Sequence, residues 1–207
     1  MPDNLHTERT FFSLLHDDKE FTQIVIPMLQ RDYAQGRKNS DVNRVRNNFL
    51  SAIENAIVNH QHLKLDFVYG SRTDDGNLIL LDGQQRLTTL FLLHWYASQK
   101  ENINLQEYDF LSKFKYEIRP STTHFCNQLL ANHIDTNKPS LSEQIKDAPW
   151  YPLMWDNDPT IQGMLLMIDE LHKRFFHIHD LWTLLTRENI ISFDFLDINN
   201  DLKMSGM

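Results

Sequence analysis

The sequence LILLDGQQRLTTLFLLHWY, Leu78–Tyr96, decides the fold of this chain. Its first four residues are all aliphatic, which is typical of a buried strand, and this run ends at Asp82-Gly83. From Leu87 onward the apolar residues recur at helical spacing. The stretch therefore predicts a strand, a tight turn and a helix in direct succession.

The turn Asp82–Arg86, which we call the DGQQR corner, carries the polar residues of this stretch. Gly83 permits backbone conformations that other residues resist. The amides of Gln84, Gln85 and Arg86 would form an unpaired helix N-terminus, which attracts anions. The Arg86 guanidinium is a planar fork suited to phosphate oxygens, and Asp82 can hold a metal, a water or Arg86 itself. The alternative is that Asp82 only caps the helix and that the first turn is solvated.

The order of strand, turn and helix also places this corner at the carboxyl end of a strand, where open sheets bind ligands. Thr88 and Thr89 add hydroxyl groups on the next turn of the helix. Both features favour a phosphate-binding corner over a simple helix cap.

Length, composition and charge set limits on the class of protein. The chain has 207 residues, 41% of them hydrophobic, which is enough for a globular core. Its formal charge of -8 disfavours a protein that coats DNA, so that any DNA contact has to be a local basic patch. The single cysteine, Cys126, fits a reducing compartment and is interpreted as a buried thiol. The sequence shows neither a signal peptide nor an apolar run of about 20 residues, and we expect a cytoplasmic protein without membrane contact.

A second polar cluster follows a second predicted strand. Phe21–Ile26 is rich in β-branched and aromatic residues and ends at Pro27. Gln30 and Arg31 come next, with amide and guanidinium donors, and Tyr33 offers a ring for base stacking and a hydroxyl for phosphate. The alternative is an irregular surface loop whose arginine pairs with a carboxylate.

Other elements follow from periodicity and turn signals. The pattern predicts a helix over Val42–Val58 capped by Asp41, and a hairpin that joins the strand Leu65–Ser71 to the strand at Leu78 through Thr73–Asn77. Regular pairing in this hairpin would bring Asp66 and Phe67 near the DGQQR corner. Further predicted elements are short helices over Thr7–Leu15, Ser121–Ala131 and Leu181–Leu185, a helix capped by Ser140 with Glu143, a helix from Thr160 as cap to Phe176, and strands in Phe110–Arg119 and Ile190–Ile198.

Three further features of the sequence could be sites. His60 and His62 have no further ligand nearby, and we interpret them as part of a loop. His177 with His179 and Asp180 lacks the spacing and the fourth ligand of a zinc site, and we interpret this group as a solvated helix end. The aromatic stretch around Trp150 and Trp155 is interpreted as core, whereas an exposed cluster would indicate a partner surface.

Three segments together resemble a known family. IPMLQRDY, FVYGS and LLDGQQRLTTL, in this order and with a helix between the first two, resemble the DGQQR-motif, ParB/sulfiredoxin-like domain at the N-terminal end of GmrSD-type (type IV) restriction endonucleases and related phage-defence proteins. PTIQGMLLMIDEL, from Pro159, resembles the helical half of that family, so the likeness covers essentially the whole chain.

The resemblance implies an α/β (α+β) fold with a small ParB/sulfiredoxin-like sheet. It implies a nucleotide-binding domain over residues 1–107 and a mostly helical region over residues 108–207. Relatives continue further, often into an HNH-type nuclease region. We therefore expect a chain truncated at its C-terminal end that works with such a region or with a partner subunit.

The resemblance also implies a function: binding and hydrolysis of a nucleoside triphosphate that controls cleavage of foreign or modified DNA. Asp82, Gln84, Gln85 and Arg86 would be catalytic, with Asp82 at a divalent metal, Mg²⁺ by expectation. The residues expected to bind the nucleotide and its phosphates are Gln30, Arg31, Tyr33, Gly83, Arg86 and Thr88. The alternative functions are a switch module that binds nucleotide or DNA phosphate without turnover, and a purely structural or interaction fragment.

Overall fold

The computed structural model describes residues 7–17, 21–27, 33 and 40–198. A six-stranded mixed sheet runs through them in the order β1-β6-β3-β4-β2-β5. The strands are β1 (Thr7–Arg9), β2 (Gln23–Ile26), β3 (Leu63–Arg72), β4 (Asn77–Asp82), β5 (Phe114–Tyr116) and β6 (Ile191–Asp197). β1 with β6 and β3 with β4 are antiparallel pairs, while β6 with β3, β4 with β2 and β2 with β5 are parallel.

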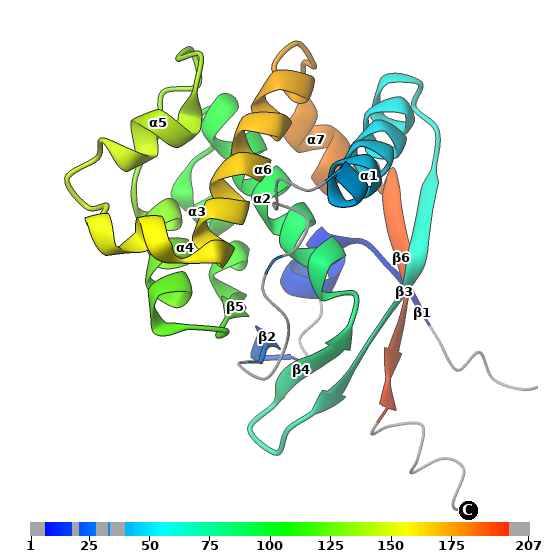
Figure 1. Ribbon diagram of the computed structural model, residues 1–207. Coiled ribbons are helices and arrows are strands. Elements are labelled where there is room, and N and C mark those ends of the chain that lie inside the picture. The colour runs from blue at the N-terminus through cyan, green and yellow to red at the C-terminus, as the bar shows by residue number, and fades with distance from the viewer. Residues whose placement is uncertain (1–6, 18–20, 28–32, 34–39, 199–207) are drawn as a thin grey trace, which may run out of the picture.

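The helices lie above and to the left of the long strand β3 in Figure 1. They are α1 (Ser40–Val58), α2 (Gln84–Lys100), α3 (Leu105–Tyr108), α4 (Pro120–Ala131), α5 (Leu141–Lys146), α6 (Pro159–Phe175) and α7 (Leu181–Thr186). Shorter helical turns are η1 (Ser13–Asp17), η3 (Asp109–Lys113) and η4 (Leu153–Asn157). The mixed α/β fold predicted from the sequence is therefore confirmed.

Helix α2 is the central element of the fold. Every residue of α2 from Leu87 to Gln99 is buried, on all sides of the helix. It packs against α6 and α7, and α6 lies in front of it in Figure 1. Two polar side chains inside it bond to the backbone of the preceding turn: Ser98 Oγ donates to Trp95 O at 2.7 Å, and His94 Nδ1 lies 2.8 Å from Leu90 O. A helix buried on every face belongs in a core, which is why this stretch organises the chain.

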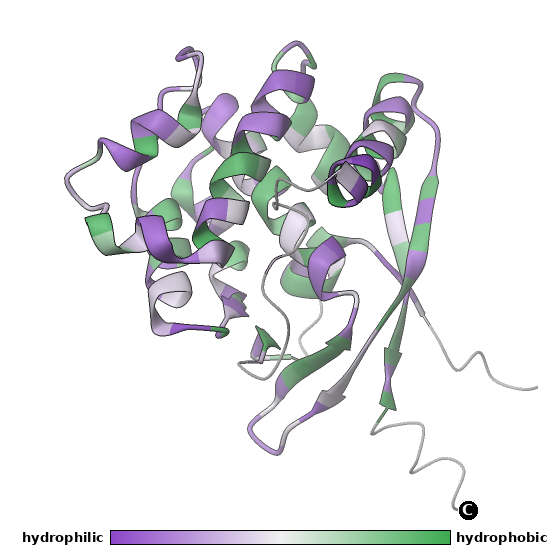
Figure 2. Ribbon diagram, viewed as in Figure 1, coloured by the Kyte–Doolittle hydropathy of each residue, from purple (hydrophilic) through white to green (hydrophobic). Residues whose placement is uncertain are grey.

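The β3–β4 hairpin has the predicted turn. Gly76 has φ +79, which glycine adopts without strain, and Thr73 N donates to Asn77 O at 2.8 Å. In Figure 2, β4 is coloured hydrophobic and the tip of the hairpin hydrophilic, as expected for a strand that enters the core from a solvated turn. The hairpin pairs Tyr69 with Asp82, so that β3 runs beside the DGQQR corner.

Three local predictions were wrong. Thr7–Arg9 is a strand, not the start of a helix, because β6 supplies a pairing partner from the far end of the sequence. Helix α1 begins at Ser40, so Asp41 lies in its first turn and does not precede it. Helix α6 is capped by Asp158, whose carboxylate accepts from Thr160 N at 2.9 Å, and the helix starts at Pro159, a favoured first position.

Most of the remaining helices and strands agree with the predictions to within a few residues, whereas α3 and η4 were not predicted. The expected cap of α5 is present, since Ser140 Oγ accepts from Glu143 N at 3.2 Å. Cys126 is buried and free, and burial raises the pKa of its thiol to about 12. In the aromatic stretch, Trp155 is buried against the ring of Phe125, whereas Leu153 and Met154 are exposed.

Residues on both sides of position 107 build the same sheet. β5 and β6 come from the region expected to be mostly helical, and β6 lies between β1 and β3. One hydrophobic cluster includes Leu78 of the first region and Phe193 of the second. The expected division near Glu107 stays a prediction.

Candidate functional site

The DGQQR corner lies where β4 ends and α2 begins. Gly83 joins the two elements with φ +83, a conformation that other residues rarely adopt. A Cβ atom at this position would lie 2.6 Å from Val68 Cγ2, inside van der Waals contact. The turn thus approaches β3 so closely that only glycine fits.

The N-terminus of α2 carries no side-chain cap from the described residues. Its N-cap is Gly83, which has no side chain, and its first turn holds no acidic residue. The alternative in which Asp82 caps the helix is therefore wrong. The first backbone N–H groups and the positive end of the helix dipole point at the corner, which is the arrangement that binds anions.

Arg86 is fixed at this corner by three acceptors. Its Nη2 donates to Phe67 O at 2.6 Å and to Asp82 Oδ2 at 3.2 Å, and its Nη1 lies 3.2 Å from Asp66 Oδ2. The Arg86 side chain is only 18% exposed, whereas Asp82 is 54% and Asp66 95% exposed. A guanidinium held this way presents its fork in one fixed orientation.

Gln84 and Thr88 stabilise the corner from inside. Gln84 is buried, and its Nε2 donates to Leu80 O at 2.9 Å, which ties the first turn of α2 back to β4. Thr88 is fully buried, and its hydroxyl donates to Gln84 O at 2.8 Å. Gln85 is half-buried, and its carbonyl accepts from Thr89 Oγ1 at 2.9 Å.

Tyr33 lies beneath the second turn of α2. It is fully buried, and its hydroxyl is 2.6 Å from Thr89 Oγ1. Burial raises the pKa of this phenol, while the bond to Thr89 and the charge of Arg46 oppose the shift. In this structure the ring packs in the core, and its expected contact with a nucleotide stays a prediction.

Gln30 and Arg31 lie outside the described residues. The strand that precedes them is nevertheless where the sequence predicted it. β2 ends at Ile26 and runs parallel to β4, with Ile24 opposite Leu78. Because the carboxyl ends of parallel neighbours meet at one edge of the sheet, the carboxyl end of β2 lies at the same edge as the DGQQR corner.

The sequence alone did not reveal the ion pair between Asp66 and Arg86. Hairpin pairing correctly placed Asp66 and Phe67 near the corner, but β3 shifts its register between Tyr69 and Gly70. An irregular register decides which side chains reach across, and a sequence pattern does not show it.

A separate cleft of 560 Å³ lies between α1 and α6. Its lining is polar, with Arg46 and Glu54 from α1 and Lys173 and Arg174 from α6 among its residues. Arg174 Nη1 donates to Ser51 Oγ and to Glu54 Oε2, both at 3.1 Å. Arg174 is thus a second partly buried, ion-paired arginine, 20% exposed, outside the DGQQR corner.

The described residues hold neither a metal-binding cluster of three side chains nor a membrane-spanning helix. Within residues 7–17, 21–27, 33 and 40–198, no three His, Cys, Asp or Glu side chains are grouped so that they could hold a metal ion. Among the helices in these ranges, none is long and apolar enough to cross a membrane.

Comparison with known proteins identifies the family. Neither the curated proteins nor the solved structures gave a significant match. A family model described as "GmrSD restriction endonuclease, N-terminal domain" matches residues 11–204, which include the DGQQR corner and all the helices described above. The match spans nearly the whole sequence, and the chain belongs to the family of GmrSD restriction endonuclease N-terminal domains.

Proposed function

We propose that this chain is the nucleotide-binding and nucleotide-hydrolysing part of a DNA restriction protein, with the phosphates bound at the DGQQR corner. The observation that carries the proposal is the N-terminus of α2, which has no side-chain cap from the described residues and starts beside the guanidinium of Arg86. Backbone amides, a helix dipole and an arginine fork at one point form a phosphate site.

Phosphoryl transfer depends mainly on positioning and on neutralising charge. In this proposal Arg86 and the amides of Gln84 and Gln85 hold phosphate oxygens, and Gly83 allows the backbone to approach them. Gln30, Arg31 and Tyr33 would complete the site from the segment after β2, and Thr88 would support it from the second turn of α2.

Asp82 is the proposed ligand of a divalent cation. Mg²⁺ is commonly held by one or two carboxylates together with water and substrate phosphates, so it does not need a cluster of three protein ligands. The Asp82 carboxylate is half exposed beside the helix N-terminus and fits that role. When bound, Mg²⁺ would neutralise the phosphate charge and orient the attacking water.

The family name is the basis for proposing DNA as a partner. We propose that nucleotide turnover controls cleavage of foreign or modified DNA in the cytoplasm by a C-terminal nuclease region or a partner subunit. With a formal charge of -8, the chain would contact DNA through a local patch only.

Nucleotide binding is tested by thermal shift of the full chain with ATP, GTP, CTP and UTP, each with Mg²⁺ or with EDTA. A ligand that binds only the folded state stabilises it, by about 2.7 kcal/mol at a hundredfold excess over the dissociation constant. We expect one nucleotide to raise the melting temperature of the wild type and of Arg174→Ala, but not of Arg86→Ala. Arg174 is the matched control, because it is an equally buried and ion-paired arginine elsewhere. A shift that survives in Arg86→Ala contradicts the assignment of the phosphates to this corner.

Turnover is tested by phosphate release from the nucleotide that binds. Loss of release in Asp82→Asn, with binding retained, would support Asp82 as the metal ligand. Binding without any release by the wild type would favour the alternative, a switch module. That alternative has an observation in its favour, since Asp82 already accepts a hydrogen bond from Arg86 and is not a freely available base.

A further inference from the structure

Asp66 contacts the DGQQR corner although it belongs to another strand. It lies on β3, and its Oδ2 is 3.2 Å from Arg86 Nη1. Its side chain is 95% exposed, whereas the arginine it holds is 18% exposed. Nη1 of the fixed Arg86 guanidinium is thus paired with a carboxylate that is almost fully exposed to solvent.

The three acceptors around Arg86 differ in how easily they can leave. Phe67 O is part of the β3 backbone and cannot move without disturbing the hairpin. Asp82 is the last residue of β4 and the first residue of the corner, and its side chain is half exposed. Asp66 can leave by rotating its side chain into solvent, so that its position on Nη1 is the exchangeable one. A carboxylate and a phosphate present similar oxygens to a guanidinium fork, and both compete for the same arm.

We propose that Asp66 is a specificity-determining residue: it occupies the phosphate position on Arg86 in the absence of ligand and makes the corner select the metal complex of a nucleoside triphosphate over the free anion. This inference rests on the function proposed above. A free triphosphate must displace one carboxylate and then remain beside two, Asp66 and Asp82. A bound divalent cation reduces that repulsion because it neutralises part of the phosphate charge.

The size of the effect follows from Coulomb's law. Two unit charges about 5 Å apart in water repel each other enough to change a binding constant roughly four-fold, and salt reduces this effect. Removing the Asp66 charge should therefore improve binding of the free anion by roughly four-fold at low salt. Binding of the Mg²⁺ complex should change less, because its net charge is smaller.

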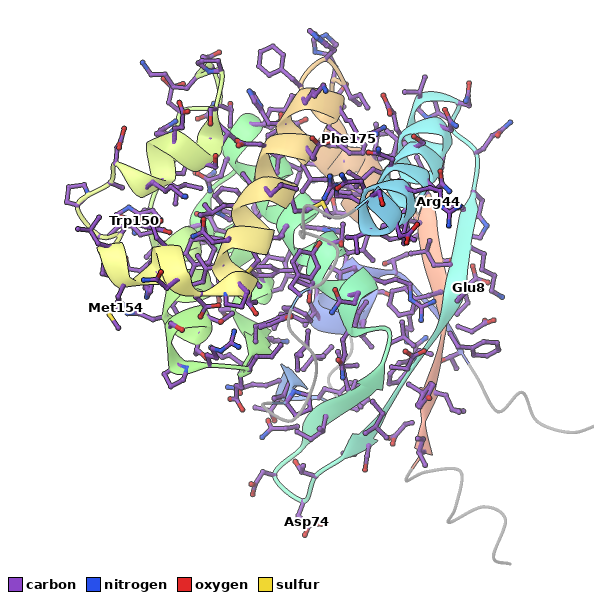
Figure 3. All side chains as sticks on the ribbon, viewed as in Figure 1. Glu8, Arg44, Asp74, Trp150, Met154 and Phe175 are labelled. Carbon is purple, nitrogen blue, oxygen red and sulfur yellow. The ribbon has the colours of Figure 1, made fainter. Side chains whose placement is uncertain are left out.

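The experiment measures the affinity of the full chain for ATP, GTP, CTP and UTP by calorimetry, with excess Mg²⁺ or with EDTA. The variants are Asp66→Asn, Asp66→Glu and the control Asp74→Asn. Asp74 carries the same charge at the tip of the same hairpin, away from the corner (Figure 3). We expect Asp66→Asn to bind the metal-free nucleotide roughly four-fold more tightly than the wild type. The ratio of the affinity for the Mg²⁺ complex to the affinity for the metal-free nucleotide should therefore fall by nearly four-fold. Asp66→Glu, which keeps the charge, and Asp74→Asn should both behave as the wild type.

The ratio of the two affinities within one variant does not depend on how much of that variant is folded, and a purely structural role would change both affinities together. Equal or weaker binding of the metal-free nucleotide by Asp66→Asn overturns the inference and leaves the proposed function intact if the wild type binds. Weaker binding of the Mg²⁺ complex alone also overturns it, because Asp66 would then be a metal ligand. No binding by the wild type or by Asp66→Asn refutes the proposed function and the inference with it.

Discussion

Replacing Gly83 by alanine tests the geometry of the corner without changing its charge. The added methyl group faces two separate costs. The first is backbone conformation, because φ +83 is unfavourable for alanine by about 1–2 kcal/mol. The second is contact, because the new Cβ would lie 2.6 Å from Val68 Cγ2 and 3.2 Å from Val68 Cγ1. Val68 is 1% exposed and has no space to retreat, so that overpacking adds about 1–3 kcal/mol. Together these costs should lower the free energy of unfolding of Gly83→Ala by about 2–5 kcal/mol.

Two further variants separate these costs. Gly76 has nearly the same φ, +79, but among the described residues a Cβ there would meet only Thr22 Oγ1, at 3.1 Å, so Gly76→Ala reports mainly the conformational cost. Val68→Ala removes both methyl groups that clash and costs about 1.5–3 kcal/mol by itself. In the double variant of Val68 and Gly83 the contacts with both methyl groups are removed, and only the Cβ of residue 68, 3.1 Å from the new Cβ, stays close. The losses of the two single variants should therefore sum to about 1–2 kcal/mol more than the loss measured for the double variant.

The assay is urea denaturation at 25 °C followed by tryptophan fluorescence, with the wild type and the four variants compared at constant pH. Losses that add to within about 0.5 kcal/mol in the double variant would refute the steric argument, since independent sites add to that accuracy. A Gly83→Ala loss no larger than that of Gly76→Ala would do the same. A variant that keeps most of its stability can also be titrated with nucleotide, and weaker binding is expected because the first amides of α2 are displaced.

Two other predictions concern buried groups. Burial lowers the pKa of His94 to about 4 from 6.5, so the unfolded chain takes up a proton first as the pH falls through this window. The neutral His94 side chain contributes its full stability above pH 6.5, and about 3 kcal/mol of it is lost as the pH falls toward 4. Urea titrations across this range should therefore show that the free energy of unfolding depends less on pH in His94→Leu than in the wild type. An equal dependence on pH in the two proteins would contradict the prediction. Asp158→Ala should lower the stability by about 2–3 kcal/mol because its carboxylate accepts from Thr160 N and from Ser121 Oγ. Thr160→Val should cost less than about 0.5 kcal/mol because the buried Thr160 hydroxyl has no hydrogen-bond partner among the described residues. Thermal melts of both variants check this, and the reverse order would restore Thr160 as the cap.

Periodicity and turn chemistry were sufficient for most of the local structure. The α1 helix, the β3–β4 hairpin and the strand–turn–helix at Leu78 each carry their signal within about twenty residues, so no distant partner is needed to specify them. The predictions that failed depended on distant partners or on a choice between neighbours. Thr7–Arg9 is a strand only because β6 pairs with it, and Asp158 caps α6 because Pro159 fits the first position of that helix.

Some features of the candidate site could likewise be inferred from the sequence, and others could not. Gly83, the polar residues after it and the nearness of Asp66 could be inferred from the sequence. The pairing of Asp66 with Arg86 could not, because it depends on an irregular register in β3. The burial of Tyr33 could not be inferred either, because the polar sequence before it gives no sign of a core position. The structure shows that Tyr33 is buried, with its hydroxyl 2.6 Å from Thr89 Oγ1.

The geometry of the DGQQR corner depends on the region that follows it in the sequence. Helix α2 carries the corner at its N-terminus, and its other residues are held by elements beyond position 107. The Trp95 indole donates to Leu129 O of α4 at 2.7 Å, and the Tyr96 hydroxyl lies 3.1 Å from His172 Nδ1 of α6. Without these helices, aromatic side chains that are fully buried here would be exposed to water, at a cost of about 1.5–3 kcal/mol for each large apolar side chain. A phosphate site that works by preorganised amides and a fixed guanidinium tolerates little movement of that helix. We therefore expect the corner to bind phosphate only in a chain that contains α4 and α6, so that the helical region is part of the binding unit rather than a separate domain beside it.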